Sequence, residues 1–568
     1  MKNCYFVWST VMLLFLFATN LQAEKFIVNS QQEFNDAQDD ASLNDSIIWE
    51  VGTYSDIYLN ITKSNLFIGA AEFGGTIFTG ASRVKVTGDY ITLAGFQFIG
   101  GNIGTDDIIN SYGSYNHFNQ LNLKDYTCYK YLRIREECQY NKVSYCNFEN
   151  RLNLDDQNIL SILVDESEPG YHKIQYCSFK NFDGSGNDLG IEPIRIGLST
   201  QADHISRSLV EYCYFTQCNG DGELISSKAS QNVYRFNTFE NNPKAELVLR
   251  HGSEAIVYGN FFIKGKGGVR VREGQDHYLY NNYFYELDDR AIFLQNESSD
   301  PLDNINIAFN TIVSCSEVIL GSDGNNNPTN VTFANNIFAD PDDKLFEEAT
   351  GAETWISNLA NGDLGITLPA SGMTIQDPLL TANGEGFFGL SASSPAINSA
   401  MSGYALLPQF EGMELIDSDI LFDLMEQGRP ATVEDKDLGC SEFPHDVLIQ
   451  PIATEANTGP SYSTDIINSI NEHKPFLKNL IKLSPNPATD IVELTILLEA
   501  AAYIKIDILD LSGKTITNIF NGRMPAGKKY ISQALDTLPS GVYTVIARRK
   551  DIQNGIENIQ TIKLVKQD

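Results

Sequence analysis

One short unit recurs along most of the chain and restricts its possible folds more than any other feature. The unit places Asn or Cys at a fixed point and an aromatic or aliphatic residue two positions later, as in YCNF at Cys146 or YGNFF at Asn260. The repeated positions are Phe96, Asn119, Cys146, Cys177, Cys213, Asn237, Asn260, Asn282, Asn310 and Asn336. The steps between them are 23, 27, 31, 36, 24, 23, 22, 28 and 26 residues, a period that indicates a solenoid.

A strand-rich coil of 22–24 residues is too short to contain a helix and predicts a right-handed parallel β-helix. Neighbouring coils would lie one strand spacing apart, about 4.8 Å. Residues one period apart would then be side by side, with the Asn residues in a hydrogen-bonded ladder and the three Cys packed in the core. The longer steps predict loops inserted at a corner of the coil.

The remaining segments suggest four regions in the chain. Residues 1–23 resemble a secretory signal, because Lys2 precedes an apolar run that ends at Leu21-Gln22-Ala23. Residues 24–445 form the β-helix, which begins with a short capping helix that starts at Asn29 or Ser30. The polar segment 446–480 suits a linker, and the alternating apolar residues of 481–568 predict a small β-sandwich.

Charge and cysteine content narrow the class of protein. With 40 basic and 73 acidic residues, the net charge is −33, which disfavours a nucleic-acid partner. Eight cysteines remain after the signal, and in an exported protein Cys128 and Cys138 could close a short disulfide loop. There is no CxxC pair, so a structural zinc site is not expected.

Three basic residues, Lys228, Arg250 and Arg272, recur at steps of 22 residues. They fall 9, 10 and 10 residues before Asn237, Asn260 and Asn282, and so occupy equivalent places on successive coils. Strand alternation in GGVRVREG directs Arg270 and Arg272 outward. Such a row of cations can hold a linear polyanion, and the alternative is a solvated face with fortuitous spacing.

Two acids, Asp221 and Glu223, precede Lys228, and alternation on one strand would point both carboxylates the same way. Glu192 in IEPIRIG occupies a similar place one coil earlier. Three carboxylates on adjacent coils suit Ca²⁺, and the alternative is simple charge balance for Arg195 and Lys228.

These groups fit β-elimination on a uronic-acid polysaccharide. The C5 proton is hard to remove because the neighbouring carboxylate is already negative, so a metal ion or an arginine must neutralise that carboxylate. A lysine can act as the base if nearby positive charges lower its pKa. Arg250 is then better suited to electrostatic stabilisation than to proton donation.

The stretches ELISSKAS, LVLRHG, GGVRVREGQDHYLYNNYF and DLMEQGRPATVEDKDLG resemble polysaccharide lyase family 6, which contains chondroitinase B and alginate lyases. The resemblance covers roughly residues 24–445 and implies a calcium-assisted lyase on a parallel β-helix. It implies Lys228 as the base and Arg250 as the acid. The implied calcium ligands are Asp221, Glu223 and Glu192, with Asn187 and Asp188 as substitutes for the third. The implied substrate-binding residues are Arg195, His251, Arg270, Arg272 and His277.

The C-terminal segment resembles the sorting domain of type IX secretion substrates through SPNPATD, LSGK and LPSGVYTV. This resemblance implies passage through the outer membrane, followed by release or attachment to the cell surface. The secretion machinery is then an expected partner of this segment.

Several functions remain compatible with the sequence. The first hypothesis is an exported alginate lyase, and a chondroitin or dermatan sulfate lyase uses the same chemistry. A β-helical glycoside hydrolase would need paired carboxylates and no catalytic lysine. A noncatalytic carbohydrate-binding solenoid would need the ladder but not Lys228, Arg250 and the acids together.

Overall fold

The computed structural model describes residues 23–566 apart from short internal segments. Those segments are 154–156, 185–189, 296–301, 323–325, 383–386, 414–419, 426, 445–451, 463–480, 485–487, 499–501, 510–514, 525–526, 536–537 and 552–556. The predicted signal sequence, except for its last residue, lies outside the described residues. The substitute ligands Asn187 and Asp188 lie outside them as well.

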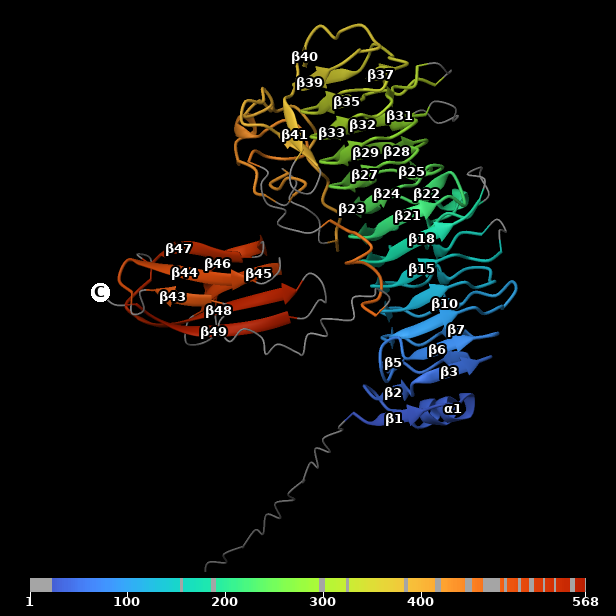
Figure 1. Ribbon diagram of the computed structural model, residues 1–568. Helices are drawn as coiled ribbons and strands as arrows, with labels where there is room; N and C mark the ends of the chain where they lie inside the picture. Colours follow the sequence, from blue (N-terminus) through green and yellow to red (C-terminus); the bar gives the residue numbers. More distant parts are fainter. Residues whose placement is uncertain are drawn as a thin grey trace, which may run out of the picture.

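The chain folds into a parallel β-helix, as the repeat predicts, and its coils stack from β1 to β40 (Figure 1). Three long parallel sheets form its walls. The first sheet, here the β1 sheet, has 14 strands. They are β1 (Lys25–Val28), β2 (Ser46–Trp49), β5 (Phe67–Ala70), β8 (Thr92–Ala94), β11 (His117–Asn119), β14 (Lys142–Ser144), β17 (Lys173–Gln175), β20 (Leu209–Glu211), β23 (Val233–Arg235), β26 (Ile256–Tyr258), β29 (Gln275–Tyr280), β32 (Asp303–Ala308), β35 (Thr332–Ala334) and β38 (Thr354–Ile356).

The second sheet, the β3 sheet, also has 14 strands. They are β3 (Gly52–Ser55), β6 (Thr76–Thr79), β9 (Phe96–Ile99), β12 (Asn122–Lys124), β15 (Asn147–Glu149), β18 (Ser178–Phe182), β21 (Tyr214–Cys218), β24 (Thr238–Glu240), β27 (Phe261–Ile263), β30 (Tyr283–Tyr285), β33 (Thr311–Val313), β36 (Ile337–Ala339), β39 (Asn358–Asn361) and β40 (Met373–Ile375).

The third sheet, the β4 sheet, has 12 strands and carries the predicted site residues. They are β4 (Tyr58–Ile61), β7 (Arg83–Val86), β10 (Ile109–Ser111), β13 (Leu132–Ile134), β16 (Leu160–Ile162), β19 (Ile194–Ile196), β22 (Glu223–Ser227), β25 (Glu246–Leu249), β28 (Gly267–Val271), β31 (Arg290–Leu294), β34 (Val318–Ile319) and β37 (Phe346–Glu347).

The predicted Asn ladder is present in the interior. The backbone N–H of Asn237 donates to the side-chain oxygen of Asn260 at 3.0 Å, and Asn260 donates in the same way to Asn282 at 2.9 Å. The same contact continues to Asn358, which the repeat analysis missed. In the coil of β12, however, the equivalent position is Leu121 and not Asn119, because Asn122 pairs with Asn147.

Each coil turns at residues with left-handed backbone. Tyr212, Gln217 and Gln231 mark the three corners of one coil, with φ of 54°, 52° and 59°. A side chain in this conformation costs about 1 kcal/mol. The N–H of each corner residue donates to a carbonyl of the next coil, as from Gln231 to Ser253 at 2.9 Å, so pairing between coils offsets the strain.

Helix α1 (Gln31–Asp40) covers the first coils as predicted, and the side chain of Ser30 accepts the Glu33 N–H at its start. Phe34 on α1 is fully buried against Trp49. No helix in the described part of the chain is long and apolar enough to cross a membrane. The eight cysteines after residue 22 are buried free thiols, so the structure does not contain the Cys128–Cys138 disulfide.

The segment after the last coils packs back onto the β-helix. It contains β41 (Leu380–Ala382) and β42 (Phe388–Leu390) as an antiparallel hairpin. Residues 452–462, which lie inside the predicted linker, are also anchored: Tyr462 donates to the carbonyl of Gln120 at 2.7 Å, and Gly459 donates to that of Tyr176 at 2.8 Å. This part of the predicted linker 446–480 is therefore packed on the β-helix, which polar composition did not indicate.

The C-terminal region is a β-sandwich, as predicted. Two antiparallel sheets, β43-β44-β47 and β46-β45-β48-β49, share one apolar core that includes Leu494, Ile506 and Val545. The strands are β43 (Ile481–Ser484), β44 (Ile491–Leu498), β45 (Ala502–Leu509), β46 (Thr515–Met524), β47 (Gly527–Ala534), β48 (Gly541–Asp551) and β49 (Glu557–Lys566). The exact domain boundaries stay predictions.

The Asn ladder generates a stability prediction. Replacing Asn260 with Ala removes the acceptor of the buried Asn237 N–H, which should lower the free energy of unfolding by about 3 kcal/mol. Chemical denaturation measures this change. The control Asn35→Ala, on the exposed side of α1, should change stability by less than about 0.5 kcal/mol. Equal effects of the two substitutions would contradict a stabilising ladder.

Candidate functional site

Lys228, Arg250 and Arg272 form the predicted column on the outer side of the β4 sheet. Ser227 pairs with Leu249, and Leu249 pairs with Val271, so the three basic residues follow equivalent strand positions. Their N–H groups donate to the preceding coil at 2.8–2.9 Å. Val271 is buried while the side chain of Arg272 remains 32% exposed, which confirms the alternation expected from the sequence.

Lys228 is placed where its charged form is destabilised. Only 9% of the residue is exposed. Burial lowers its pKa from the usual 10.5, and the positive charges of Arg195 and Arg250 lower it further. Within the described residues its ammonium forms no hydrogen bond or ion pair. Lys228 can therefore lose its proton and accept another one.

Glu223 fixes the cations beside Lys228. Its Oε1 accepts from Arg250 at 2.6 Å and from Arg270 at 3.4 Å, while its Oε2 is buried without a hydrogen-bond partner. A bulge in β22 places Glu223 opposite Glu246 on β25. The two carboxylates thus lie side by side under the arginines.

Glu246 is a site residue that the sequence analysis missed. It is fully buried and contacts Arg270 at 3.2 Å and Arg290 at 2.8 Å. Glu246 follows Glu223 by 23 residues, the same step as the ladder, and that step was the available signal. Arg290 was missed because its strand carries no other cation.

The three predicted metal ligands lie near one another, but each carboxylate already accepts hydrogen bonds from other groups of the protein. Both oxygens of Glu192 accept from Arg195, at 2.7 and 2.8 Å. The strand pairing puts Glu192 level with Glu223, as predicted. Asp221 differs from the prediction: it precedes β22, and its oxygens accept the N–H groups of Glu223 at 3.0 Å and Gly190 at 2.6 Å. It therefore does not alternate with Glu223 on one strand.

These carboxylates have the chemistry of a hard-cation site. Glu223 Oε2 lacks a partner, and burial raises the pKa of Glu192 with a further contribution from the charges of Asp221 and Glu223. A bound cation would give Glu223 Oε2 a partner and would lower the pKa of Glu192. Among the described residues, no group of three or more His, Cys, Asp or Glu side chains is arranged so that it could hold a metal ion. A cation bound here would have to compete with Arg195 and Arg250.

The two histidines predicted to bind substrate differ in position. His251 is partly exposed, and its Nδ1 contacts the Glu273 carboxylate beside the column. His277 is fully buried, and its ring nitrogens contact the Ala255 N–H and the Glu273 carbonyl. His277 therefore has a structural role at this corner, and its contact with substrate stays a prediction.

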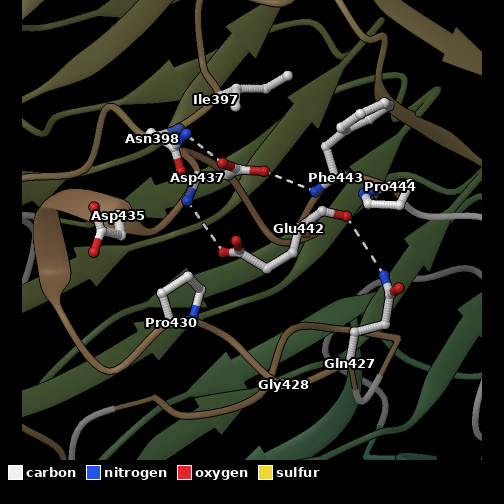
Figure 2. Close-up of a pocket in the computed structure, with 10 residues that line it drawn as sticks. All are labelled: Ile397, Asn398, Gln427, Gly428, Pro430, Asp435, Asp437, Glu442, Phe443 and Pro444. Atoms are coloured by element: carbon white, nitrogen blue, oxygen red, sulfur yellow. Dashed lines mark hydrogen bonds between the residues drawn. The ribbon is translucent and has the colours of Figure 1, made fainter.

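The stretch DLMEQGRPATVEDKDLG lies away from this column. It contributes to a separate pocket of about 460 Å³ (Figure 2). There Asp437 accepts the N–H groups of Asn398 and Phe443, and Glu442 accepts from Arg429. Arg429 also donates to Asn281 of the β-helix at 2.9 Å. This network attaches the segment after the last coils to the β-helix. None of the predicted site residues lines the pocket.

Two protein-family models match separate parts of the chain. A family model described as chondroitinase B matches residues 28–319, and one described as a secretion system C-terminal sorting domain matches residues 482–562. No curated protein matches the chain.

Solved structures share the fold. The PL6 family alginate lyase AlyGC is 22% identical with a TM-score of 0.59, over 65% of this chain and 55% of its own length. The chain thus spans little more than half of that lyase. A mannuronic acid specific family 6 lyase from human gut microbiota is 22% identical with a TM-score of 0.51, over 60% of this chain and 86% of its own. A PL6 alginate lyase solved with a trisaccharide is 19% identical with a TM-score of 0.54, over 66% and 92%.

The surroundings of Lys228 generate a prediction about its pKa. NMR titration of ¹³C-methylated lysines should give Lys228 a pKa below 10.5. Arg195→Gln should raise that pKa, because it removes a positive neighbour and leaves Glu192 without its partner. Arg207→Gln, at a corner of the coil, serves as the control and should not shift it. A normal pKa for Lys228, or a fall in Arg195→Gln, would contradict the described electrostatics.

Proposed function

The chain belongs to the chondroitinase B family of polysaccharide lyases, polysaccharide lyase family 6, and from this premise we propose that it cleaves alginate by β-elimination. The observation that carries the proposal is the buried Lys228, which has a lowered pKa and stands beside the ordered cation Arg250. This pair supplies the base and the positive charge that elimination next to a carboxylate requires.

In the proposed reaction, Lys228 takes the C5 proton of a uronate ring. Its neutral amine is the reactive form, so the lowered pKa increases the fraction able to react near neutral pH. As the C5–H bond breaks, negative charge develops on the adjacent carboxylate. The C4–O4 bond then breaks, leaving a C4–C5 double bond, and the leaving oxygen takes a proton from water.

Arg250 stabilises the developing charge. Its contact with Glu223 at 2.6 Å holds the guanidinium in place before substrate arrives, so little reorganisation accompanies the reaction. The guanidinium stays protonated at any working pH, which makes it a stabiliser in preference to a proton donor. Arg195, Arg270, Arg272 and His251 would hold the carboxylates of neighbouring rings.

We also propose Ca²⁺ as a cofactor, held by Glu192, Asp221 and Glu223. When bound, the ion would supply additional positive charge to neutralise the uronate carboxylate. The unpartnered Oε2 of Glu223 supports this assignment. Asp221 contributes a shorter side chain than Glu, and both of its oxygens already accept backbone N–H groups.

Alginate is the substrate that the charge spacing favours. A polyuronate carries a carboxylate on every ring, and the face presents a cation on each of three successive coils, about 4.8 Å apart. The similar structures named alginate lyases support the same choice. Chondroitin or dermatan sulfate, in which only alternate rings are uronates, is the second candidate because the matching family model is described as chondroitinase B.

The C-terminal sandwich supports export. The sorting-domain match over 482–562 is a type IX secretion signal, so the protein is directed to the cell surface or the medium. We propose that its polysaccharide substrate is met there. The secretion machinery is then the partner of the sandwich and has no part in the chemistry.

Substitutions at the column test the mechanism. Lys228→Ala should lower kcat on alginate by about a thousandfold, and Arg250→Gln by about a hundredfold or more. Ultraviolet absorbance of the unsaturated uronyl end measures both. Lys173→Ala, a lysine on the β1 sheet, is the control and should keep full activity. Full activity of a folded Lys228→Ala protein would rule out the proposed base.

Removal of calcium tests the cofactor. Treatment with EDTA should suppress elimination, and added Ca²⁺ should restore it, because the ion shares the neutralisation of the uronate carboxylate. Ca²⁺ should also raise the melting temperature of wild type but not of Glu223→Gln. Activity and stability that are both indifferent to EDTA would leave neutralisation to the arginines alone.

A further inference from the structure

The cationic surface of the β4 sheet extends well beyond Lys228 toward the N-terminal coils. Strand pairing aligns Lys85, Asn110, Arg133, Ser161 and Arg195 in one outward column. Lys85 lies five coils before the strand of Lys228, which is about 24 Å along the axis. The column therefore joins the candidate site to a distant group of cations on the same face.

Two aromatic side chains are interleaved with these cations. Tyr112 is 40% exposed and lies between Lys85 and Arg135, whose charged groups are 5.1 and 4.9 Å from its ring centre. Tyr129 has Lys130 and Arg133 at 4.8 Å each. Cation–π contacts hold Lys85 and Arg135 without neutralising them, whereas Arg133 also forms an ion pair with Asp107.

The charge at this end of the face is only partly balanced, because Asp107 pairs with Arg133 at 2.8 Å. In the described part of the chain neither Lys85 nor Arg135 forms an ion pair, although the protein has a net charge of −33. Burial lowers the pKa of Lys130 to about 7, and the nearby Arg195 and Arg133 add to this effect. Lys85 and Arg135 lie against the same ring of Tyr112 and repel one another, so their placement suits an anionic ligand.

The C-terminal end of the β4 sheet carries apolar and acidic side chains. The paired positions Phe293 on β31 and Ile319 on β34 are apolar. Burial raises the pKa of Glu317, the charge of Glu347 raises it further, and Glu347 forms an ion pair with Lys344. A polyanion on this face is therefore attracted toward the N-terminal coils and repelled from the C-terminal ones.

We propose that Lys85, Arg135 and Tyr112, with Arg133 and Tyr129 beside them, form an extended binding track for the polyuronate chain, several sugar rings away from the bond that is cleaved. This inference rests on the proposed function, because the track continues the outward column of the site. The cations bind ring carboxylates, and the tyrosine edges and hydroxyls line the path between them. The track thereby makes the protein prefer long polyuronate chains over short ones.

Chain-length dependence tests the track. Lys85→Gln/Arg135→Gln should raise the KM for polymeric alginate about fivefold to tenfold, with kcat unchanged, since two cation–carboxylate contacts are lost. The kcat/KM for uronate trimers, which occupy only the site at Lys228, should change by less than about twofold. The charge-retaining variant Lys85→Arg/Arg135→Lys should restore the wild-type KM.

The matched control is Lys142→Gln/Lys173→Gln, which removes two neighbouring lysines from the β1 sheet. Retardation of the full-length proteins in native gels that contain alginate measures binding without catalysis. The track variant should be retarded less than this control.

The two proposals can fail separately. A wild-type protein that produces no unsaturated ends would overturn the proposed function, while the gel assay still decides the track. Equal effects of the track variant on polymer and trimer, or retardation equal to the control, would overturn the track.

Discussion

The in-register pairing of each coil with the next is the interaction on which the structure depends. It holds corners of left-handed backbone against their intrinsic cost, and it aligns the buried Asn side chains in a ladder that satisfies backbone N–H groups. Because the spacing is constant at about 4.8 Å, residues one period apart become neighbours. The repeat thus converts a spacing in the sequence into columns of side chains in space.

The same pairing organises the charges of the β4 sheet. Glu223 and Glu246 are buried beneath the arginines and fix Arg250, Arg270 and Arg290 through direct contacts. Burying such pairs gains little stability, because desolvation opposes their attraction. Their benefit lies in preorganisation, since cations already fixed around Lys228 need not reorder when negative charge develops on a bound anion.

Sequence reasoning predicted the features that follow from the period and failed where local geometry decides. The column of Lys228 and Arg250 follows directly from the repeat. Asp221 was predicted to lie on the same strand as Glu223, but it lies in a turn before β22, where its carboxylate accepts the Glu223 N–H. Periodicity does not reveal such a turn. The burial of His277 was not foreseen, because strand alternation alone does not show that its ring fills a buried corner. Glu246 was missed because the bulge that aligns it with Glu223 is a tertiary feature.

In the proposed binding mode, a polyuronate chain lies along the outer face of the β4 sheet, with the ring to be cleaved at Lys228. The most direct measurement is a crystal structure of full-length Lys228→Ala with a long mannuronate oligomer. The account predicts sugar rings parallel to the axis of the β-helix, with one ring carboxylate at Arg250 and the chain continuing toward the N-terminal coils. An oligomer bound to another sheet, or running across the coils away from position 228, would contradict it.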